Sequence, residues 1–361
     1  MFEVDRQEIR TTRVIDAAPT TLEPGQVRLS VERFAFTSNN ISYAVAGDML
    51  DYWGFFPTDA PWGRIPAIGI GSVVESANPD IGVGGRYFGF YPMADELIVQ
   101  AERRGAHGFR DVGPHRANHA TTYTDFSDIT ADPTFDIDKA DEYLLLWGMF
   151  MTSFLIDDQL GDRGFEGAST AIVTSASSKT AISLASCLAA RGDVRAIGLT
   201  SERNRAFVES LGLYDRVAAY DEVAELDPSA RTGVVDMAGN AQVRANIHRH
   251  YGASLAFSIS VGATHWDQRA TDPTPLPGPA PEFFFAPGQR AKRVDDWGAA
   301  ELDARIDRAY RNLVDHGGGW LRVDHRQGPA WIEATYSELL NGSADPAAGF
   351  ICIPQPEETT P

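Results

Sequence analysis

One segment constrains the fold more than any other part of the chain, the stretch from Thr170 to Asp221. Its pattern predicts a strand, a tight turn, a helix and a second strand, followed by a short polar loop. This order is typical of a mononucleotide-binding βαβ unit, in which the turn and the helix N-terminus hold a phosphate group. The turn itself has the sequence SASSKTA over residues 175–181, whereas a glycine-rich sequence is usual there.

The turn is still suited to a phosphate, because serine and alanine are the smallest side chains after glycine. Ser177 and Ser178 are favourable residues for capping the N-terminus of the following helix. Hydroxyl groups also bond phosphate oxygens, and Lys179 adds a positive charge. We therefore predict that Ser175, Ser177, Ser178, Lys179 and Thr180 bind the phosphates of a dinucleotide. The alternative is a capped helix with no ligand.

The end of the second strand indicates which dinucleotide would bind. NAD sites usually carry an acidic residue there, which bonds the ribose 2′-hydroxyl. This chain has Thr200, Ser201 and Arg203 after Leu199, and these residues suit a 2′-phosphate better. We therefore predict NADP(H) rather than NAD. Glu202 could instead face the ribose, and a further alternative is that Ser201 caps a helix while Arg203 faces solvent.

Strands alternate with helices from about residue 142 onward, which predicts an α/β fold with a Rossmann-type, doubly wound parallel sheet. Gly239 and Gly262 follow two of the later strands, so we expect them at the carboxyl edge of the sheet, where ligands bind in such folds. The strands are expected near 170–175, 194–199, 216–220, 233–237 and 254–261.

The first part of the chain, to about residue 145, is predicted to be rich in β-strands. The segment from Val27 to Phe34 alternates between apolar and polar residues, as a half-buried strand does. Residues 102–140 are polar and lack such a pattern, so we expect a long irregular loop there, of the kind that often has a function or covers a site.

Composition limits the partners of the chain. The formal net charge of −19 argues against nucleic acid or an anionic membrane as the main partner. Only Cys187 and Cys352 are present, too few for a disulfide framework or a cysteine-rich zinc site. The N-terminus shows no secretory signal, and no apolar run approaches the roughly 20 residues that span a bilayer. We expect a cytoplasmic protein that acts on a small molecule.

Four segments resemble the medium-chain dehydrogenase/reductase superfamily, near its zinc-independent quinone oxidoreductase branch. They are VRLSVERFAFTSNNISYAVAGD, IPAIGIGSVVESANPDIGVGGRYFGF, DEYLLLWGMFMTSFLIDDQL and WLRVDHRQGPAWIEATYSELLNGSADPAAGFICIP. The motifs WGRIPAIG, SASSKTA, VGATHWD and FFFAPGQRAKR further resemble a bacterial family known as a domain of unknown function. The resemblance implies a GroES-like catalytic domain over 1–145, a Rossmann domain over 146–315 and a C-terminal return into the first domain over 316–361.

Alcohol dehydrogenases of this superfamily bind catalytic zinc with a Cys on an early loop and with a His-Glu pair. Asn39-Asn40 and Ala67-Ile68 occupy those regions here, so we predict that the chain binds no metal. Zinc-free members transfer hydride from NADPH to an activated alkene or carbonyl. The resemblance therefore predicts an NADPH-dependent oxidoreductase acting on an enone, a quinone or another small carbonyl compound.

Three residues are candidates for the chemistry. Tyr43 lies where the family has its active-site loop, and its phenol could donate a hydrogen bond as negative charge develops on a carbonyl oxygen. Asn40 could orient the substrate or the nicotinamide. His265 could transfer a proton, since histidine titrates near neutral pH. Ordinary packing of Tyr43, and a loop-anchoring hydrogen bond for His265, are the alternatives; Asp48 and Tyr52 are weaker candidates.

Other possibilities remain open at this point. The aromatic segment 51–62 could line a substrate pocket, belong to the core or form a dimer contact. A homodimer could form through an edge strand near 255–261 or through 283–285. The fold could also serve a lyase or isomerase without net hydride transfer, or a cofactor-free relative with a structural or regulatory role.

Overall fold

The structure is a computed structural model, and it divides into two compact units. Unit 1 consists of Met1–Leu145 and Val323–Pro361, and unit 2 consists of Leu146–Arg322. The described residues are 1–16, 20–105, 108–131, 135–237, 239–261 and 275–355. Among them, no helix is both long and apolar enough to cross a membrane.

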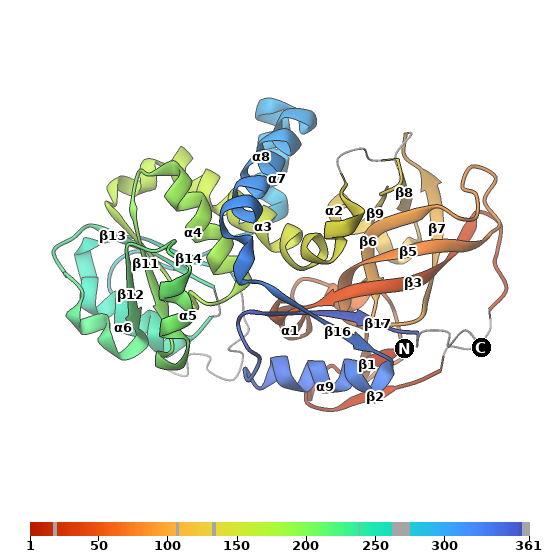
Figure 1. The fold of residues 1–361 in the computed structure, drawn as a ribbon, viewed down its shortest axis with the longest axis horizontal. Helices are drawn as coiled ribbons and strands as arrows, with labels where there is room; N and C mark the ends of the chain where they lie inside the picture. The colour runs from red at the N-terminus through yellow and green to blue at the C-terminus, as the bar shows by residue number, and fades with distance from the viewer. Residues whose placement is uncertain (17–19, 106–107, 132–134, 238, 262–274, 356–361) are drawn as a thin grey trace. The chain divides into compact units, whose positions relative to one another are not determined.

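Unit 1 is built mainly from antiparallel strands (Figure 1). Its larger sheet has the order β16-β17-β3-β5-β6-β9-β8-β7, and β7 also pairs with β3, which closes part of the sheet on itself. A smaller sheet has the order β2-β1-β4. The strands are β1 (Phe2–Asp5), β2 (Thr12–Val14), β3 (Gln26–Phe36), β4 (Trp62–Gly63), β5 (Pro66–Ser76), β6 (Arg86–Pro92), β7 (Glu96–Arg103), β8 (Gly108–Asp111), β9 (Asp125–Asp128), β16 (Arg322–Gln327) and β17 (Ala348–Ile353).

The alternation predicted for the first long strand is present in β3. Val27, Leu29 and Val31 are fully buried, whereas the residues between them are partly exposed. The helical segments of unit 1 are short, apart from α9. They are α1 (Ser38–Val45), η1 (Tyr52–Gly54), η2 (Pro114–Arg116), α2 (Thr121–Thr124), η3 (Ile137–Lys139), α3 (Ala140–Asp162) and α9 (Pro329–Leu340). Helix α3 begins in unit 1 and continues in unit 2 from Leu146 onward.

Two expectations for unit 1 were wrong. The segment 102–140 is not an irregular loop, because β8 and β9 lie within it and pair with each other. Phe109 and Phe126 are buried on these strands, with stacked rings 4.9 Å apart. The second error concerns the residues around Tyr43, which form helix α1 rather than a loop. Thr37 and Asn40 make a capping box that begins this helix.

Unit 2 contains the predicted parallel sheet (Figure 1). Its strand order is β12-β11-β10-β13-β14-β15, with every pairing parallel. This is the 3-2-1-4-5-6 order of dinucleotide-binding folds. The strands are β10 (Thr170–Val173), β11 (Arg195–Thr200), β12 (Arg216–Ala219), β13 (Thr232–Asp236), β14 (Leu255–Ser260) and β15 (Glu282–Phe283). All residues of β10 and β13 are buried, as expected for central strands covered on both faces.

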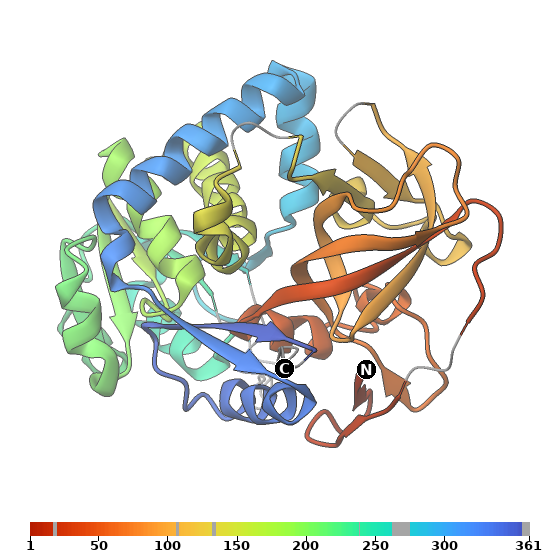
Figure 2. The same cartoon turned by 45° about the vertical axis from the view of Figure 1, so that its right-hand side comes forward.

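The helices of unit 2 connect these strands and cover the sheet. They are α4 (Lys179–Arg191), α5 (Arg205–Ser210), α6 (Ala241–Tyr251), α7 (Ala286–Trp297) and α8 (Ala299–Gly317), with 3-10 segments η4 (Gly164–Gly167), η5 (Glu202–Asn204), η6 (Tyr220–Glu225), η7 (Gly252–Ser254) and η9 (Gly318–Trp320). The long helix α8 follows α7 and packs against it (Figure 2). Helix α8 buries Leu302, Ile306 and Leu313 on one face.

The expectation that the strand near 255–261 is an edge strand was also wrong, whereas the homodimer itself stays a prediction. Strand β14 lies between β13 and β15, and its residues Ile259 and Ser260 pair with Glu282 and Phe283. Among the described residues, the outer strand on this side of the sheet is therefore β15, which pairs with β14 in parallel.

Candidate functional site

The strand order of unit 2 places its switch point at the carboxyl ends of β10 and β13. The order of the strands reverses between these two, and ligands of such sheets bind outside the carboxyl ends of the strands at that point. The turn after β10 and the residues after β13 both lie there. The structure thus gathers at one edge the residues that the sequence predicted separately.

The turn after β10 has the left-handed backbone that glycine usually provides. Ser175 has a φ of 50°, a conformation that costs a non-glycine residue about 1 kcal/mol or more. The hydroxyl groups of Ser175 and Tyr220 lie 3.4 Å apart. The next residue, Ala176, is fully buried and donates its N–H to the carbonyl of Leu199. A side chain at Gly198 would stand 2.9 Å from Cβ of Ala176, so glycine in β11 permits this close approach of the turn.

The helix that follows begins as predicted. The hydroxyl of Ser178 accepts a hydrogen bond from the N–H of Ala181 at 3.2 Å, so Ser178 is the N-cap of α4. The hydroxyl of Ser177 accepts a hydrogen bond from the side-chain amide of Asn204 at 3.0 Å. Lys179 and Thr180 occupy the first turn of α4, where backbone N–H groups have no acceptor within the helix and point to the N-terminal side. This end of α4 combines N–H donors with the positive end of the helix dipole.

The residues after β11 lie beside this turn, since Asn204 joins the two through its bond to Ser177. Thr200 is buried, and its hydroxyl has no hydrogen-bond partner within the described part of the chain. Ser201 precedes η5, and Arg203 within it is exposed. Glu202, the acidic residue that could bond a ribose hydroxyl, pairs instead with Arg205 at 2.8 Å.

A buried polar network fixes the residues after β13. Asp236 is 1% exposed and accepts hydrogen bonds from the Thr174 hydroxyl at 2.9 Å and from the Gly239 N–H at 3.1 Å. Arg244, on α6, donates to the other carboxylate oxygen of Asp236 at 3.1 Å and lies 3.5 Å from the hydroxyl of Ser260. The network therefore ties together the carboxyl ends of β10, β13 and β14.

The other two described candidates, Tyr43 and Asn40, lie on α1 in unit 1. The amide of Asn40 is buried and used at both ends, accepting from the N–H of Thr37 at 2.8 Å and donating to the carbonyl of Pro66 at 2.8 Å. Tyr43 is partly exposed, and its ring centroid lies 4.4 Å from that of Tyr52. Desolvation raises the pKa of the Tyr43 phenol well above its usual value, so the phenol is protonated at neutral pH.

Most of the aromatic side chains of the segment 51–62 belong to the core of unit 1. Phe55 is 1% exposed and contacts the rings of Tyr52, Phe90 and Tyr123 at centroid distances from 5.2 to 6.3 Å. His119 packs on Phe55 at 4.4 Å. We call these residues, with Tyr43 and Phe56, the aromatic cluster. Their burial favours the core interpretation of the segment over a dimer contact.

A buried arginine, Arg116, packs against this cluster. The guanidinium of Arg116 lies 4.6 Å from the ring centre of Phe55 and donates to the carbonyl oxygen of Phe55 at 3.1 Å. Asp111 is its ion-pair partner at 3.5 Å. Burial lowers the pKa of Arg116 to about 10.

Two predicted residues, Gly262 and His265, lie outside the described residues. The described residues also contain no group of three or more His, Cys, Asp or Glu side chains that could hold a metal ion. Sequence reasoning missed Tyr220, Asn204, Arg244 and Arg205, which position the edge of unit 2. Only the placement of Tyr220 and Asn204 just after strands of a βαβ pattern could have indicated them.

The sequence was compared with protein-family models, and residues 34–345 match the family described as "Protein of unknown function (DUF2855)". The chain belongs to this family. The predicted resemblance to a bacterial domain of unknown function is thereby confirmed. No curated protein matches the sequence.

Solved structures with the same fold cover nearly the whole chain. CurA from Vibrio vulnificus in complex with NADPH has a TM-score of 0.62 and 13% identity, covering 96% of this chain and 94% of its own. YhdH of E. coli K-12 with bound NADPH has a TM-score of 0.57 and 15% identity, covering 95% of each chain. Mycobacterial Rv1454c complexed with NADPH has a TM-score of 0.55 and 14% identity, covering 98% and 99%. The predicted fold, a Rossmann-type sheet with a GroES-like β-rich part, is confirmed.

Proposed function

We propose that this protein is an NADPH-dependent oxidoreductase that acts without zinc on an enone, a quinone or another small carbonyl compound. The observation that carries the proposal is the edge of unit 2, where the turn Ser175–Thr180, the residues after β11 and the Asp236 network meet at the switch point of the sheet. Several proteins of the same fold were crystallised with NADPH or NADP, which supports this use of the edge.

The pyrophosphate of the dinucleotide would bind at the N-terminus of α4. The left-handed backbone of Ser175 turns the chain. Ser178 then caps α4, which begins at Lys179. Lys179 and Thr180 would then contribute N–H groups of the first helical turn, and Gly239 would border the same phosphates after β13. Because Ser177 and Ser178 already accept hydrogen bonds within the protein, their hydroxyl hydrogens are the groups they would offer to a phosphate oxygen.

The 2′-phosphate would be recognised by Thr200, Ser201 and Arg203. Glu202 pairs with Arg205 at 2.8 Å, and the same guanidinium pairs with Glu222 at 2.6 Å, so the Glu202 carboxylate is engaged within the protein. The buried hydroxyl of Thr200 needs an acceptor or donor, since buried polar groups are rarely left unbonded. The hydroxyl of Thr200 and the exposed guanidinium of Arg203 therefore support NADPH over NADH.

Bound NADPH would supply the hydride, and the protein would bind and polarise the substrate. We assign Tyr43 as the donor of a hydrogen bond to the substrate oxygen, because its side chain is partly exposed whereas that of the neighbouring Tyr52 is buried. Asn40 was predicted to contact the substrate or the nicotinamide directly. We propose instead that it positions Tyr43, because its side-chain amide caps the start of the helix that carries Tyr43. His265 stays a prediction for proton transfer.

Cofactor binding tests the proposal first. Isothermal titration of the full chain should show saturable binding of NADPH and weaker binding of NADH. Arg203→Glu should weaken NADPH binding about tenfold or more, the effect of losing one good charged contact, and change NADH binding little. Arg195→Glu is the matched control, because Arg195 is an exposed residue at the opposite end of β11. Absence of binding for both dinucleotides would rule out the proposed function.

Turnover tests the role of Tyr43. With a panel of enones and quinones, NADPH absorbance should fall, and Tyr43→Phe should lower kcat by about a hundredfold, the usual cost of losing one such donor. Tyr52→Phe removes the same atom from the neighbouring ring and should change kcat little. Substrate conversion with no change in NADPH absorbance would favour the lyase or isomerase alternative instead.

A further inference from the structure

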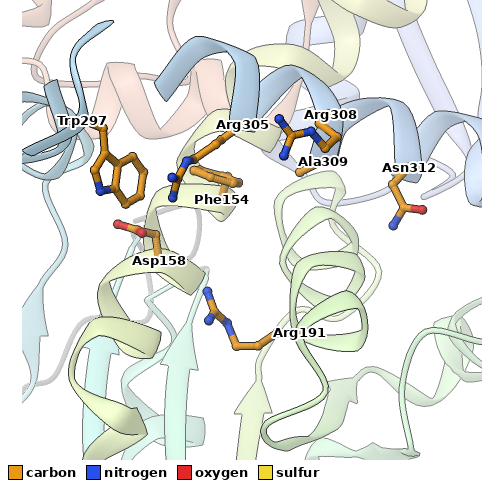
Figure 3. Close-up of a pocket in the computed structure, with 8 residues that line it drawn as sticks. All are labelled: Phe154, Asp158, Arg191, Trp297, Arg305, Arg308, Ala309 and Asn312. Carbon is orange, nitrogen blue, oxygen red and sulfur yellow. The ribbon is translucent and has the colours of Figure 1, made fainter. Parts of the chain in front are cut away.

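A polar pocket lies within unit 2, between helices rather than at the dinucleotide edge of the sheet (Figure 3). It has a volume of about 390 Å³, within the range of small-molecule sites. Its walls come from α3, α4, the end of α7 and one face of α8. The lining residues are Phe154, Asp158, Arg191, Trp297, Arg305, Arg308, Ala309 and Asn312.

The pocket is distinct from the proposed dinucleotide edge. Arg191 is the last residue of α4, whereas the phosphate turn precedes its first residue, Lys179. A helix of 13 residues is about 18 Å long from first to last residue, at 1.5 Å per residue. A ligand in the pocket therefore lies near the amino ends of the strands, and the inference does not depend on the proposed function.

The charge of the lining is opposite to that of the chain as a whole. The chain has a net charge of −19, yet three guanidinium groups and a single carboxylate line this pocket. The carboxylate, Asp158, is already neutralised, because it accepts hydrogen bonds from Arg293 at 2.6 Å and from Gln289 at 2.7 Å. Arg191 and Arg305 are likewise paired, with Asp157 and Glu301, so among the described residues the uncompensated charge of this lining is the positive charge of Arg308.

Arg191 is held in place by residues outside the lining. Its Nε and Nη2 atoms donate to the two carboxylate oxygens of Asp157 at 2.9 and 2.7 Å. The helix α3 makes room for it with Gly161, where a Cβ atom would stand 2.7 Å from the guanidinium carbon. Figure 3 shows Arg191 extending from α4 toward α3, on the side of Asp158. Its orientation is thus fixed before any ligand binds.

The two arginines of α8 differ in how they are held. Arg305 lies over the ring of Trp297 at 4.1 Å and donates its Nε to Glu301 at 2.7 Å, which leaves its Nη groups for a ligand. Arg308 has neither a hydrogen bond nor an ion pair with any residue that the structure describes. Since Arg305, Arg308 and Asn312 follow a spacing of three and four residues, they lie along one face of the helix.

We propose that this pocket binds a small phosphate monoester. Guanidinium groups that come from two helices and approach from different directions suit a tetrahedral group with three acceptor oxygens better than a planar carboxylate. Phe154, Ala309 and the indole of Trp297 provide apolar surface for the organic part of the ester. The unpaired Arg308 supplies the charge that the anion neutralises.

The test is isothermal titration of the full chain with phenyl phosphate as the probe, first without NADPH and then at saturating NADPH. We expect one saturable site with a Kd of about 1 mM or tighter, and weaker binding of inorganic phosphate, which has no apolar part. Arg308→Gln should weaken binding about tenfold, and Arg308→Lys less. Arg311→Gln should leave it unchanged, because Arg311 pairs with Asp307 and does not line the pocket.

Four results would overturn the proposal. One is the absence of saturable binding, and another is equal weakening by Arg308→Gln and Arg311→Gln, which would indicate a general charge effect. The third is loss of the phenyl phosphate signal when NADPH is added, because the probe would then occupy the dinucleotide edge. Tighter binding of benzoate than of phenyl phosphate would show that the pocket selects carboxylates, which contradicts the assigned ligand class.

Discussion

The edge of unit 2 and the aromatic cluster of unit 1 are held together in opposite ways. At the edge, a few polar side chains fix one another, as Asp236 does with Thr174 and Arg244. In the cluster, large rings pack around Phe55 with few hydrogen bonds among them. The edge includes the N-terminus of α4, whose first N–H groups have no acceptor within the helix, whereas the side chains of the cluster are mostly buried against one another. Stability should therefore depend most on the cluster, and ligand binding on the edge.

The largest expected effect comes from emptying the centre of the cluster. Phe55→Ala should lower the free energy of unfolding by about 4 kcal/mol, because the removed ring leaves a cavity among side chains that cannot close over it. Denaturant unfolding measures this loss. Val83→Ala is the control, since Val83 is 66% exposed in the same unit and should cost less than about 0.5 kcal/mol.

The same variant tests whether the two regions are separate. Where Phe55→Ala is still folded, its Kd for NADPH should equal that of the wild type, because no residue of the cluster belongs to the edge of unit 2. A loss of NADPH affinity in proportion to the loss of stability would mean that the comparison drawn above is wrong.

The next effect comes from the polar network. Asp236→Ala should cost about 3 kcal/mol, because Arg244 and the donors Thr174 and Gly239 lose their shared acceptor in a buried place. Unlike Phe55→Ala, it should also weaken NADPH binding. Unfolding and titration of this variant measure the two effects. In a double-mutant cycle, adding Arg244→Gln should recover part of the stability, and strictly additive losses would show that the pair is not coupled.

The third effect concerns the turn. Ser175→Val should lose about 2 kcal/mol, because a β-branched residue is strained at a φ of 50°. Ser175→Gly should stay within about 1 kcal/mol of the wild type, since glycine relieves this strain but gains freedom in the unfolded chain. Thermal unfolding with and without NADPH measures both variants. Equal stability of the valine and glycine variants would mean that the turn is not strained in solution.

The sequence allowed prediction of the local features of the edge. The capped helix after Ser178, the strands around it and the loop with Arg203 follow one another in the chain, so their pattern was visible. Tyr220, Asn204 and Arg244 contact the turn or the network from elsewhere, and no spacing in the sequence reports such a contact. The same holds for Arg191 and Arg308, which meet in one pocket although they are far apart in the chain.

The errors in unit 1 have a related physical cause. The run Thr37 to Asn40 is polar and lacks an amphipathic pattern, yet the capping box makes it a helix start. Strands β8 and β9 have four residues each, too short for alternation to show. They form because Phe109 and Phe126 stack in a core that is assembled from distant segments. Patterns predict elements that stabilise themselves, and they miss elements that tertiary packing stabilises.

The smallest effect concerns a buried histidine of unit 2. His248 on α6 is fully buried, with Nδ1 2.9 Å from the carbonyl of Pro277 and Nε2 2.9 Å from the hydroxyl of Ser258. Burial lowers the pKa of His248, and the nearby Arg244 acts in the same direction, while the hydrogen bond to the Pro277 carbonyl and the charge of Asp236 oppose the shift. The unfolded chain, with a histidine pKa of about 6.5, therefore binds this proton more readily than the folded one.

It follows that His248 contributes stability that is complete above about pH 6.5 and is lost as the pH falls through the folded-state pKa. Unfolding measured from pH 7.5 to 5 should show this slope in the wild type and a flatter one in His248→Gln. Ser258→Ala removes the hydroxyl partner but keeps the imidazole, so it should be less stable throughout and keep the slope. If His248→Gln retains the full slope, the pH dependence arises from other groups, and the polar interior of unit 2 is no more sensitive to acid than the packed rings of unit 1.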